Sequence, residues 1–234
     1  EKNGVYYLFF PAKDYDGIFR IGVATSASPI GPFIPQLKAI KGSFSIDPAV
    51  FKDDDESYYM YFGGLWGGQL QRWREGFFNN DEPESPTAFI PKDHEPALLP
   101  VMAKMTDDLL EFAETPKEVQ IIDENGILLL AGDNNRRFFE AAWMHKHDNR
   151  YYFSYSTGDT HFICYAVGDN PYGPFSYKGK VLNPVVGWTS HHSICTIKDK
   201  DYLFYHDSSL SKGVTHLRSV KVTEIKYRDD GTII

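Results

Sequence analysis

The chain has 234 residues, 42% of them hydrophobic and 24% charged, which is ordinary for a soluble globular protein and unlike a disordered tail. Its formal net charge of −8 argues against a nucleic-acid partner. No apolar run approaches the roughly 20 residues that a membrane helix needs. Aromatic residues make up 15%, beside 19 glycines and 14 prolines, which favours many short strands joined by tight turns. The composition therefore predicts an all-β fold.

The sequence opens on "EKNGVYYLFF", which reads as a turn followed directly by a strand. We therefore expect the visible N-terminus not to be that of the gene product, so cytoplasmic, periplasmic and secreted locations all stay open. Cys164 and Cys195 each lie in an apolar, strand-like segment. Buried free thiols are expected there rather than a disulfide or a nucleophile, and they do not identify the compartment.

Four segments repeat a turn followed by a short aromatic strand. In chain order they are "GVYYLFF" from Gly4, "SYYMYFGG" from Ser57, "RYYFSYS" from Arg150 and "DYLFYHD" from Asp201. The first two and the last two are each roughly 50 residues apart, a period typical of propeller blades. Two further segments, "IGVATSASPIGPF" and "ICYAVGDNPYGPF", match each other and are predicted to be third strands of equivalent blades.

A further apolar strand precedes three of the aromatic strands, in "SIDPAVF", "FFEAAWM" and "SHHSICT". A blade of four antiparallel strands around a central channel accounts for this arrangement, with this strand as the innermost one. Aligning the three strands places one polar side chain at the same position of each, namely Asp47, Glu140 and His191. A barrel or sandwich would also give short strands, but it would not explain this recurrence.

The segment from Gly67 to Pro100 is rich in proline, glycine, asparagine and acidic residues, without a sustained hydrophobic period. It is predicted to be a long surface loop, about residues 67–100, inside one blade. Long loops of this kind often border an active site.

Nine motifs taken together resemble glycoside hydrolase family 43 in their order and spacing. They are "YYLFFPAKD", "IGVATSASPIGPF", "SIDPAVF", "YYMYFGG", "FFEAAWMHK", "YYFSYST", "SHHSIC", "DYLFYHD" and "DDGTI". The resemblance implies a five-bladed β-propeller that acts on xylose- and arabinose-containing plant saccharides. "GGLWGGQLQRW", from Gly63, further resembles the β-xylosidase branch.

Members of that family invert anomeric configuration with three carboxylates, and two of them can be matched here. Asp47 of "SIDPAVF" matches the aspartate that orients the acid, and Glu140 of "FFEAAWM" matches the general acid. The family more often has Gly-Pro where this chain has Ala141 and Ala142. A general acid must hold a proton for the leaving oxygen, and burial beside a second carboxylate keeps a carboxylic acid protonated near neutral pH.

The resemblance also implies ligand contacts. The "SHHSIC" motif matches one whose histidine faces the propeller axis, where many members hold calcium or another cation through water; the register favours His191 over His192 as that residue. Arg218 of "HLRSV" matches an arginine that contacts substrate and the carboxylates. Four aromatic residues could stack on a sugar ring, namely Trp143, Phe139, Trp66 and Phe10, and Trp66 is favoured for the pocket. No organic cofactor is implied.

Each of these residues also has a purely structural interpretation. Asp47 can belong to an Asp-Pro turn, and Glu140 can be a hydrogen-bonded, half-buried carboxylate. The histidines can be hydrogen-bonded core residues, Arg218 can form a salt bridge at the rim, and aromatic residues in propeller strands are usually core. The repeat register and the family motifs favour the functional interpretation of Asp47 and Glu140.

We expect residues 1–234 to form a single catalytic propeller domain that is incomplete at its N-terminus. The family's general base is an aspartate of the first blade, and neither that blade nor a base has a counterpart here, so an N-terminal segment carrying both is the expected partner. The predicted function is an inverting exo-glycosidase that releases xylose from β-1,4-xylo-oligosaccharides. α-L-Arabinofuranosidase, endo-arabinanase and a non-catalytic carbohydrate-binding propeller are the alternatives.

Overall fold

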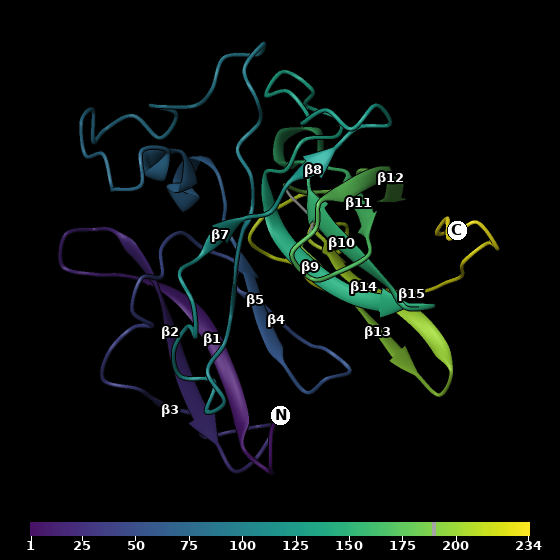
Figure 1. The fold of residues 1–234 in the computed structure, drawn as a ribbon, viewed down its shortest axis with the longest axis horizontal. Coiled ribbons are helices and arrows are strands. Elements are labelled where there is room, and N and C mark those ends of the chain that lie inside the picture. The colour runs from purple at the N-terminus through teal and green to yellow at the C-terminus, as the bar shows by residue number, and fades with distance from the viewer. Residues whose placement is uncertain (189–190) are drawn as a thin grey trace. The chain divides into compact units, whose positions relative to one another are not determined.

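A computed structural model describes residues 1–188 and 191–234 (Figure 1). Contacts within the chain divide it into two compact units. The first comprises Glu1–Phe89 and Val101–Lys117, and the second comprises Ile90–Pro100 and Glu118–Ile234. The organisation as a single domain stays a prediction.

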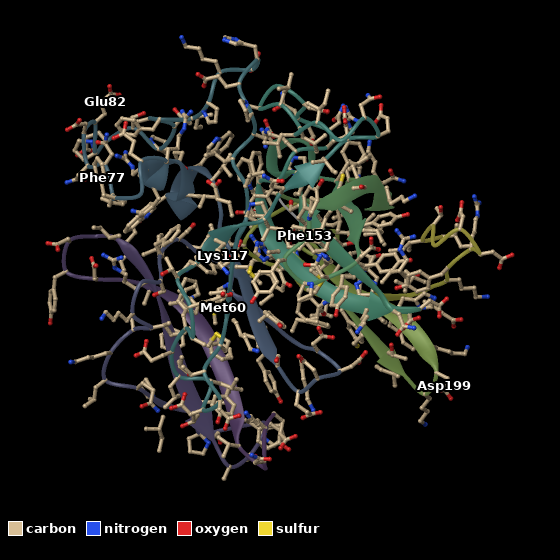
Figure 2. The ribbon with its side chains drawn as sticks, viewed as in Figure 1. Met60, Phe77, Glu82, Lys117, Phe153 and Asp199 are labelled. Atoms are coloured by element: carbon tan, nitrogen blue, oxygen red, sulfur yellow. The ribbon has the colours of Figure 1, made fainter. Side chains whose placement is uncertain are left out.

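The first unit contains two sheets. One has three antiparallel strands, in the order β1 (Tyr6–Lys13), β2 (Phe19–Ser26) and β3 (Ile34–Pro35). The other has four strands, in the order β4 (Ala49–Lys52), β5 (Tyr58–Phe62), β6 (Val101–Lys104) and β7 (Lys117–Glu118). All five residues of β5 are buried, and Met60 at its centre is 0% exposed (Figure 2). A central strand covered on both faces explains why this segment reads as continuously apolar instead of alternating.

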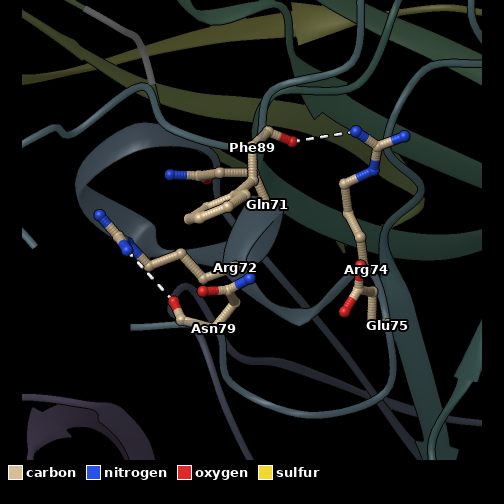
Figure 3. A pocket seen from close by; sticks show the side chains of 6 residues that line it. All are labelled: Gln71, Arg72, Arg74, Glu75, Asn79 and Phe89. Atoms are coloured by element: carbon tan, nitrogen blue, oxygen red, sulfur yellow. Dashed lines mark hydrogen bonds between the residues drawn. The ribbon is translucent and has the colours of Figure 1, made fainter. Parts of the chain in front are cut away.

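The predicted loop of about residues 67–100 is confirmed as an excursion between β5 and β6 of the same sheet. It contains two short 3-10 helices, η1 (Trp66–Gly68) and η2 (Leu70–Trp73), and no strand in its described residues. The Arg72 side chain organises it by donating hydrogen bonds to four backbone carbonyls, those of Asn79, Asp81, Glu82 and Ser85, at 2.8–3.2 Å. Beside it lies a pocket of about 300 Å³ (Figure 3), lined by Gln71, Arg72, Arg74, Glu75, Asn79 and Phe89.

The second unit also contains two sheets. The larger has five strands, in the order β8 (Ile121–Ile122), β12 (Phe175–Leu182), β11 (Ile163–Gly168), β10 (Arg150–Ser156) and β9 (Glu140–His147). The smaller has three, in the order β13 (His192–Ile197), β14 (Lys200–Asp207) and β15 (Ser219–Ile225). A third short helix, η3 (Gly158–Thr160), follows β10.

The core of the second unit joins its two sheets. Seven buried residues form one cluster, Tyr152, Tyr165, Val167, Ile194, Leu203, Ile225 and Ile233, with Trp143 packed against them. Buried aromatic area on this scale dominates packing energy, which is why the aromatic strands recur in the sequence. Phe153, at the centre of β10, is 0% exposed (Figure 2).

The structure confirms the strand predictions in detail. The four aromatic segments form β1, β5, β10 and β14, and the three preceding apolar segments form β4, β9 and β13, each at the edge of its sheet. Both cysteines are free, but only Cys164 is buried; Cys195 is exposed, because it lies on β13 where that strand faces outward. Within the described residues, no helix is long and apolar enough to cross a membrane.

Candidate active site

Glu140 is the first residue of β9 and lies at a β-bulge. It pairs with Ser156 of β10, whereas Trp143 pairs with Ser154, so Ala141 and Ala142 together oppose a single residue of β10. Ala141 has a φ of 60°, in the left-handed region that glycine occupies without steric cost. A bulge breaks the alternation of side chains between the two faces and re-aims the residue beside it. The glutamate is therefore placed by the backbone, and its side chain is 12% exposed.

The residues on either side of this bulge are tightly packed. The Phe139 N–H donates to the Ser156 carbonyl at 3.0 Å, and the Phe139 ring lies over Gly158, where a Cβ would come within 2.2 Å of the ring. The guanidinium of Arg137 lies over the same ring, 5.4 Å from its centre. Phe139 is 2% exposed, so it packs as a core residue that supports Glu140. Its ring is not accessible for the sugar stacking predicted from the sequence.

Arg137, three residues before Glu140, supports the packing around the bulge. It is 7% exposed and donates to the Ala131 carbonyl at 3.0 Å and to Asn134 Oδ1 at 2.8 Å. Its Nη2 also lies 3.2 Å from Asp159 Oδ1, so it ties the segment before β9 to the segment after β10. Burial lowers the pKa of Arg137, and Asp159 opposes that shift.

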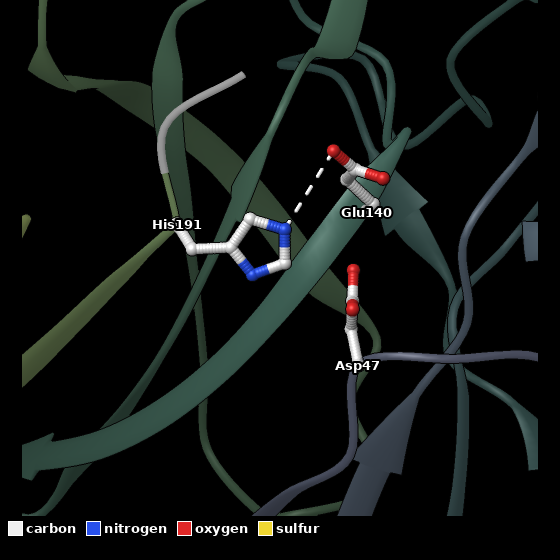
Figure 4. A group of neighbouring side chains, drawn as sticks. All are labelled: Asp47, Glu140 and His191. Atoms are coloured by element: carbon white, nitrogen blue, oxygen red, sulfur yellow. Dashed lines mark ion pairs between the residues drawn. The ribbon is translucent and has the colours of Figure 1, made fainter. Parts of the chain in front are cut away.

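His191 and His192 point in different directions, as strand alternation predicts. Nε2 of His191 lies 3.7 Å from Oε1 of Glu140 (Figure 4). Nε2 of His192 instead lies 2.6 Å from Ser154 Oγ inside the second unit, and burial lowers the pKa of His192 to about 3. The two imidazoles therefore do not converge on one ion. The metal prediction for His192 is corrected to a neutral core histidine, and His191 is the one that faces the candidate acid.

Arg218 lies one residue before β15 and is exposed. Its Nε donates to the Thr215 carbonyl at 3.0 Å, and its Nη1 lies 3.4 Å from Nε2 of His206. His206, on β14, also accepts a hydrogen bond from the backbone N–H of His191 at 3.1 Å. Burial, then Arg218, lowers the pKa of His206, so its imidazole is neutral near pH 7. His206 has no sequence signal beyond its place in an aromatic strand.

Trp143 of β9 connects the two sheets of the second unit. Its ring packs against the core cluster, and its Nε1 donates to the Ile194 carbonyl of β13 at 3.1 Å. Trp143 therefore packs as a core residue, which is the structural interpretation given for it from the sequence. Its indole N–H already donates a hydrogen bond to Ile194. The packing does not support the predicted contact of Trp143 with a sugar ring.

Asp47 and Trp66 belong to the first unit, where a glycine-rich segment holds their surroundings. Ser45 Oγ donates to the Gly68 carbonyl at 2.7 Å and accepts from the Gly64 N–H at 2.9 Å. Gly68 is required because a Cβ there would come within 2.8 Å of the Ile46 side chain. The segment leading to Asp47 is thereby bonded to the segment that carries Trp66. Asp47 itself has a φ of 59°, is half-buried and lies two residues before β4.

Comparison with known proteins identifies the family. The family model for glycosyl hydrolases family 43 matches residues 1–233. The chain belongs to this family of glycoside hydrolases. It is 59% identical over 233 residues to a xylosidase/arabinosidase of Bacteroides ovatus, covering 100% of the chain and 70% of that relative. A β-xylosidase of Xylanibacter ruminicola is 54% identical over 233 residues, with 100% and 71% covered.

Solved structures agree in fold. A family 43 β-xylosidase/α-arabinofuranosidase from a compost microbial metagenome, in complex with xylotriose and in a calcium-free form, superposes with a TM-score of 0.96 at 63% identity. The match covers 100% of this chain and 70% of that one. A family 43 enzyme of Xanthomonas citri complexed with xylotriose gives 0.94 at 52% identity, covering 100% and 69%. The predicted all-β, propeller-type fold and its β-xylosidase-like branch are thus confirmed.

Proposed function

We propose that this chain is the catalytic part of an exo-acting, inverting β-xylosidase that releases xylose from the non-reducing ends of β-1,4-xylo-oligosaccharides. The observation that carries the proposal is Glu140, a carboxyl group 12% exposed at a bulge of β9 with an imidazole 3.7 Å away. The similarity to xylosidases, and to enzymes solved with xylotriose, supports the substrate class.

In this proposal Glu140 is the general acid. It gives its proton to the glycosidic oxygen as the bond to the leaving sugar breaks, so the departing group leaves as a neutral alcohol. The carboxylate that remains faces His191, whose ring can stabilise the new negative charge until the proton returns. Asp47 is proposed as the aspartate that orients the acid, and Arg218 as the cation that contacts the substrate. These residues supply the acid side of the reaction.

Trp66 is the aromatic candidate that lies on the excursion between β5 and β6. It is half-buried at the start of η1, and it has a φ of 53°, an unusual conformation for a tryptophan. The burial of Phe139 and the hydrogen bond of the Trp143 indole argue against this role for those two residues. We propose Trp66 as the residue that stacks on the xylose ring.

α-L-Arabinofuranosidase activity is the second candidate, because relatives of 59% identity carry both activities in their names. Xylose in its pyranose form and arabinose in its furanose form present similar hydroxyl patterns to a short pocket. Rates on the nitrophenyl derivatives of the two sugars discriminate the alternatives.

Replacing Glu140 by glutamine tests the acid assignment in the whole gene product. General acid catalysis contributes roughly 10²- to 10⁴-fold, so Glu140→Gln should lose about that factor on xylobiose. A dinitrophenyl xyloside should lose far less, since its leaving group departs without protonation. Glu118→Gln, at an exposed glutamate of the second unit, is the matched control and should keep full turnover on both substrates.

Two results would contradict the proposal. Equal losses on xylobiose and on the dinitrophenyl xyloside would show that Glu140 is not the acid. Proton NMR of the first product supplies the other test, because inversion at a β-xyloside must release α-xylose before mutarotation. An initial β-xylose signal would exclude the inverting mechanism.

A calcium ion held through water is the remaining part of the proposal. Calcium prefers six to eight oxygen ligands, whereas His191 offers nitrogen, so this imidazole fits a water-mediated contact better than direct coordination. Such an ion would supply positive charge near the reacting carboxyl groups. If this is correct, exhaustive chelation should lower turnover and added calcium should restore it; full activity after chelation would remove the ion from the proposal.

A further inference from the structure

The two residues proposed to contact the acid and the substrate lie just outside their strands. His191 precedes β13 by one residue, and Arg218 precedes β15 by one residue. β14 is the central strand between them, and its ladder pairs His192 with Tyr205 at one edge and Ser219 with Asp207 at the other. The main-chain ladders of the sheet therefore stop immediately before both functional residues.

His206, near the C-terminal end of β14, continues the connection with its side chain. Its Nε2 accepts from the His191 backbone N–H at 3.1 Å and lies 3.4 Å from Nη1 of Arg218. Both partners are obligatory donors, since a backbone N–H and a guanidinium have no acceptor to offer. Nε2 must then carry the lone pair and Nδ1 the proton. One imidazole acceptor thus holds the ends of two strands.

The same contact restricts Arg218. A guanidinium has five N–H donors in one plane, and here Nε is fixed by the Thr215 carbonyl and Nη1 by His206. Two anchors on different atoms define the plane of the guanidinium. Nη2 remains as the donor that can reach a sugar hydroxyl, because none of the hydrogen bonds found in the described residues uses it.

We propose that His206 is a positioning residue for the glycosidase reaction: it holds the Arg218 guanidinium and the His191 backbone in the geometry that binds the sugar. The inference rests on the proposed roles of Arg218 and Glu140. It goes beyond them because it assigns a function to a residue of an aromatic strand that contacts neither the acid nor the substrate in the scheme above. A neutral side chain with an acceptor at the Nε2 position is required.

Two variants of His206 distinguish the effect of its hydrogen-bond acceptor from the effect of its side-chain volume. His206→Leu removes the acceptor and keeps an apolar side chain of comparable size. His206→Gln keeps a hydrogen-bonding oxygen near the position of Nε2. Hydrogen bonds to charged groups contribute about 1.5–3 kcal/mol, which corresponds to about 10- to 100-fold. We expect kcat/KM for a nitrophenyl xyloside to fall by about that factor in His206→Leu and to recover in large part in His206→Gln.

A double-mutant cycle with Arg218→Ala distinguishes positioning from general destabilisation. If His206 acts through Arg218, His206→Leu should reduce kcat/KM about 10- to 100-fold beside Arg218. The reduction should be smaller in the Arg218→Ala enzyme, where only the hydrogen bond to the His191 backbone remains to be lost. His145→Gln is the matched control. Nε2 of that histidine lies 2.7 Å from the Tyr227 hydroxyl, and its replacement should lower the melting temperature without lowering kcat/KM of the folded enzyme.

The outcomes are exclusive. Equal losses from His206→Leu in both backgrounds, or no loss at all in a folded variant, would overturn the inference. If His206→Leu does not fold, the cycle is measured with His206→Gln, where additive effects likewise overturn it. Failure of the Glu140→Gln test is a separate result, because the cycle measures the coupling of His206 to Arg218 on the activity of the unchanged acid.

Discussion

The two sheets of the second unit hold their functional residues in different ways. In the five-stranded sheet, β11 is buried along its whole length and β10 along all but its first residue, and Glu140 is placed by backbone pairing at a bulge. In the three-stranded sheet, β13 and β15 are largely exposed, and His191 and Arg218 lie beyond the ends of the ladder. Hydrogen bonds to the His206 side chain position these two residues instead.

The difference agrees with the roles proposed above for Glu140 and Arg218. A general acid needs one fixed direction, and a bulge in a buried sheet supplies it at the level of the main chain. A cation that binds a sugar must be reached from solvent, so it lies at an exposed end, where side chains are the means of fixing it. Steric strain near the bulge should disturb the position of Glu140. Loss of the single acceptor on His206 should disturb the positions of His191 and Arg218.

Steric strain at the bulge gives the largest effect. Gly158 has a φ of +70°, and a Cβ there would lie 2.2 Å from Phe139, the residue before Glu140. We expect Gly158→Ala to lower the free energy of unfolding by about 3 kcal/mol or more, from the left-handed backbone and the collision together. Urea denaturation measures this. Turnover of the folded fraction should also fall, since Phe139 must move.

Gly213 provides the matched control in the same unit. Its φ is +94°, but a Cβ there would meet only Val186 Cγ1 at 3.9 Å, an ordinary contact. Gly213→Ala should therefore cost about 1 kcal/mol, the backbone contribution alone. Equal costs at the two glycines would mean that the packing of Phe139 does not constrain the acid, and the contrast between the sheets would be lost.

A separate effect should appear in the pH dependence of the free energy of unfolding. Burial lowers the pKa of His145 from 6.5 to about 3, and the same cause lowers that of His192 to about 3. Between those values the unfolded chain binds the protons, so stability is complete above pH 6.5 and falls as the pH decreases. Each histidine contributes about 1.4 kcal/mol per pH unit in this window.

The pH effect concerns the contact between the two sheets. His145 of β9 bonds the Tyr227 hydroxyl, and His192 of β13 bonds Ser154 of β10. We expect the denaturant midpoint of His145→Gln to fall less steeply than that of the unchanged protein as the pH decreases from 6.5 to 5. The carboxylates titrate in both proteins, so their contribution cancels in this comparison. Parallel curves would show that His145 is not kept neutral by burial.

The strands could be predicted well from the sequence because strands and turns in this chain differ clearly in their residue types. Aromatic strands recur with turn residues between them, and burial of those aromatics is what stabilises the sheets. Gly67–Pro100 was also identified as a loop, since no hydrophobic period can be satisfied there. Cys195 was wrongly expected to be buried, because an apolar neighbourhood in sequence does not say which face of an edge strand is covered.

The site was predictable only where a repeat or a motif marks it. The repeat brought Asp47, Glu140 and His191 to equivalent positions, and alternation separated His191 from His192. Nothing local shows that Ala141 adopts a glycine-like φ or that Phe139 packs against both Arg137 and Gly158. His206 was missed because its function depends on two residues 15 and 12 positions away, which only the sheet register brings together.

The Arg72 side chain has a consequence for the loop that it organises. Four carbonyl dipoles converge on one guanidinium, much as the oxygens of a crown ether surround a cation. All four carbonyls depend on one side chain, so a movement of the Arg72 guanidinium releases them together. The stretch from Asn79 to Ser85 should therefore open as one cooperative unit, and its amide protons should exchange with solvent together.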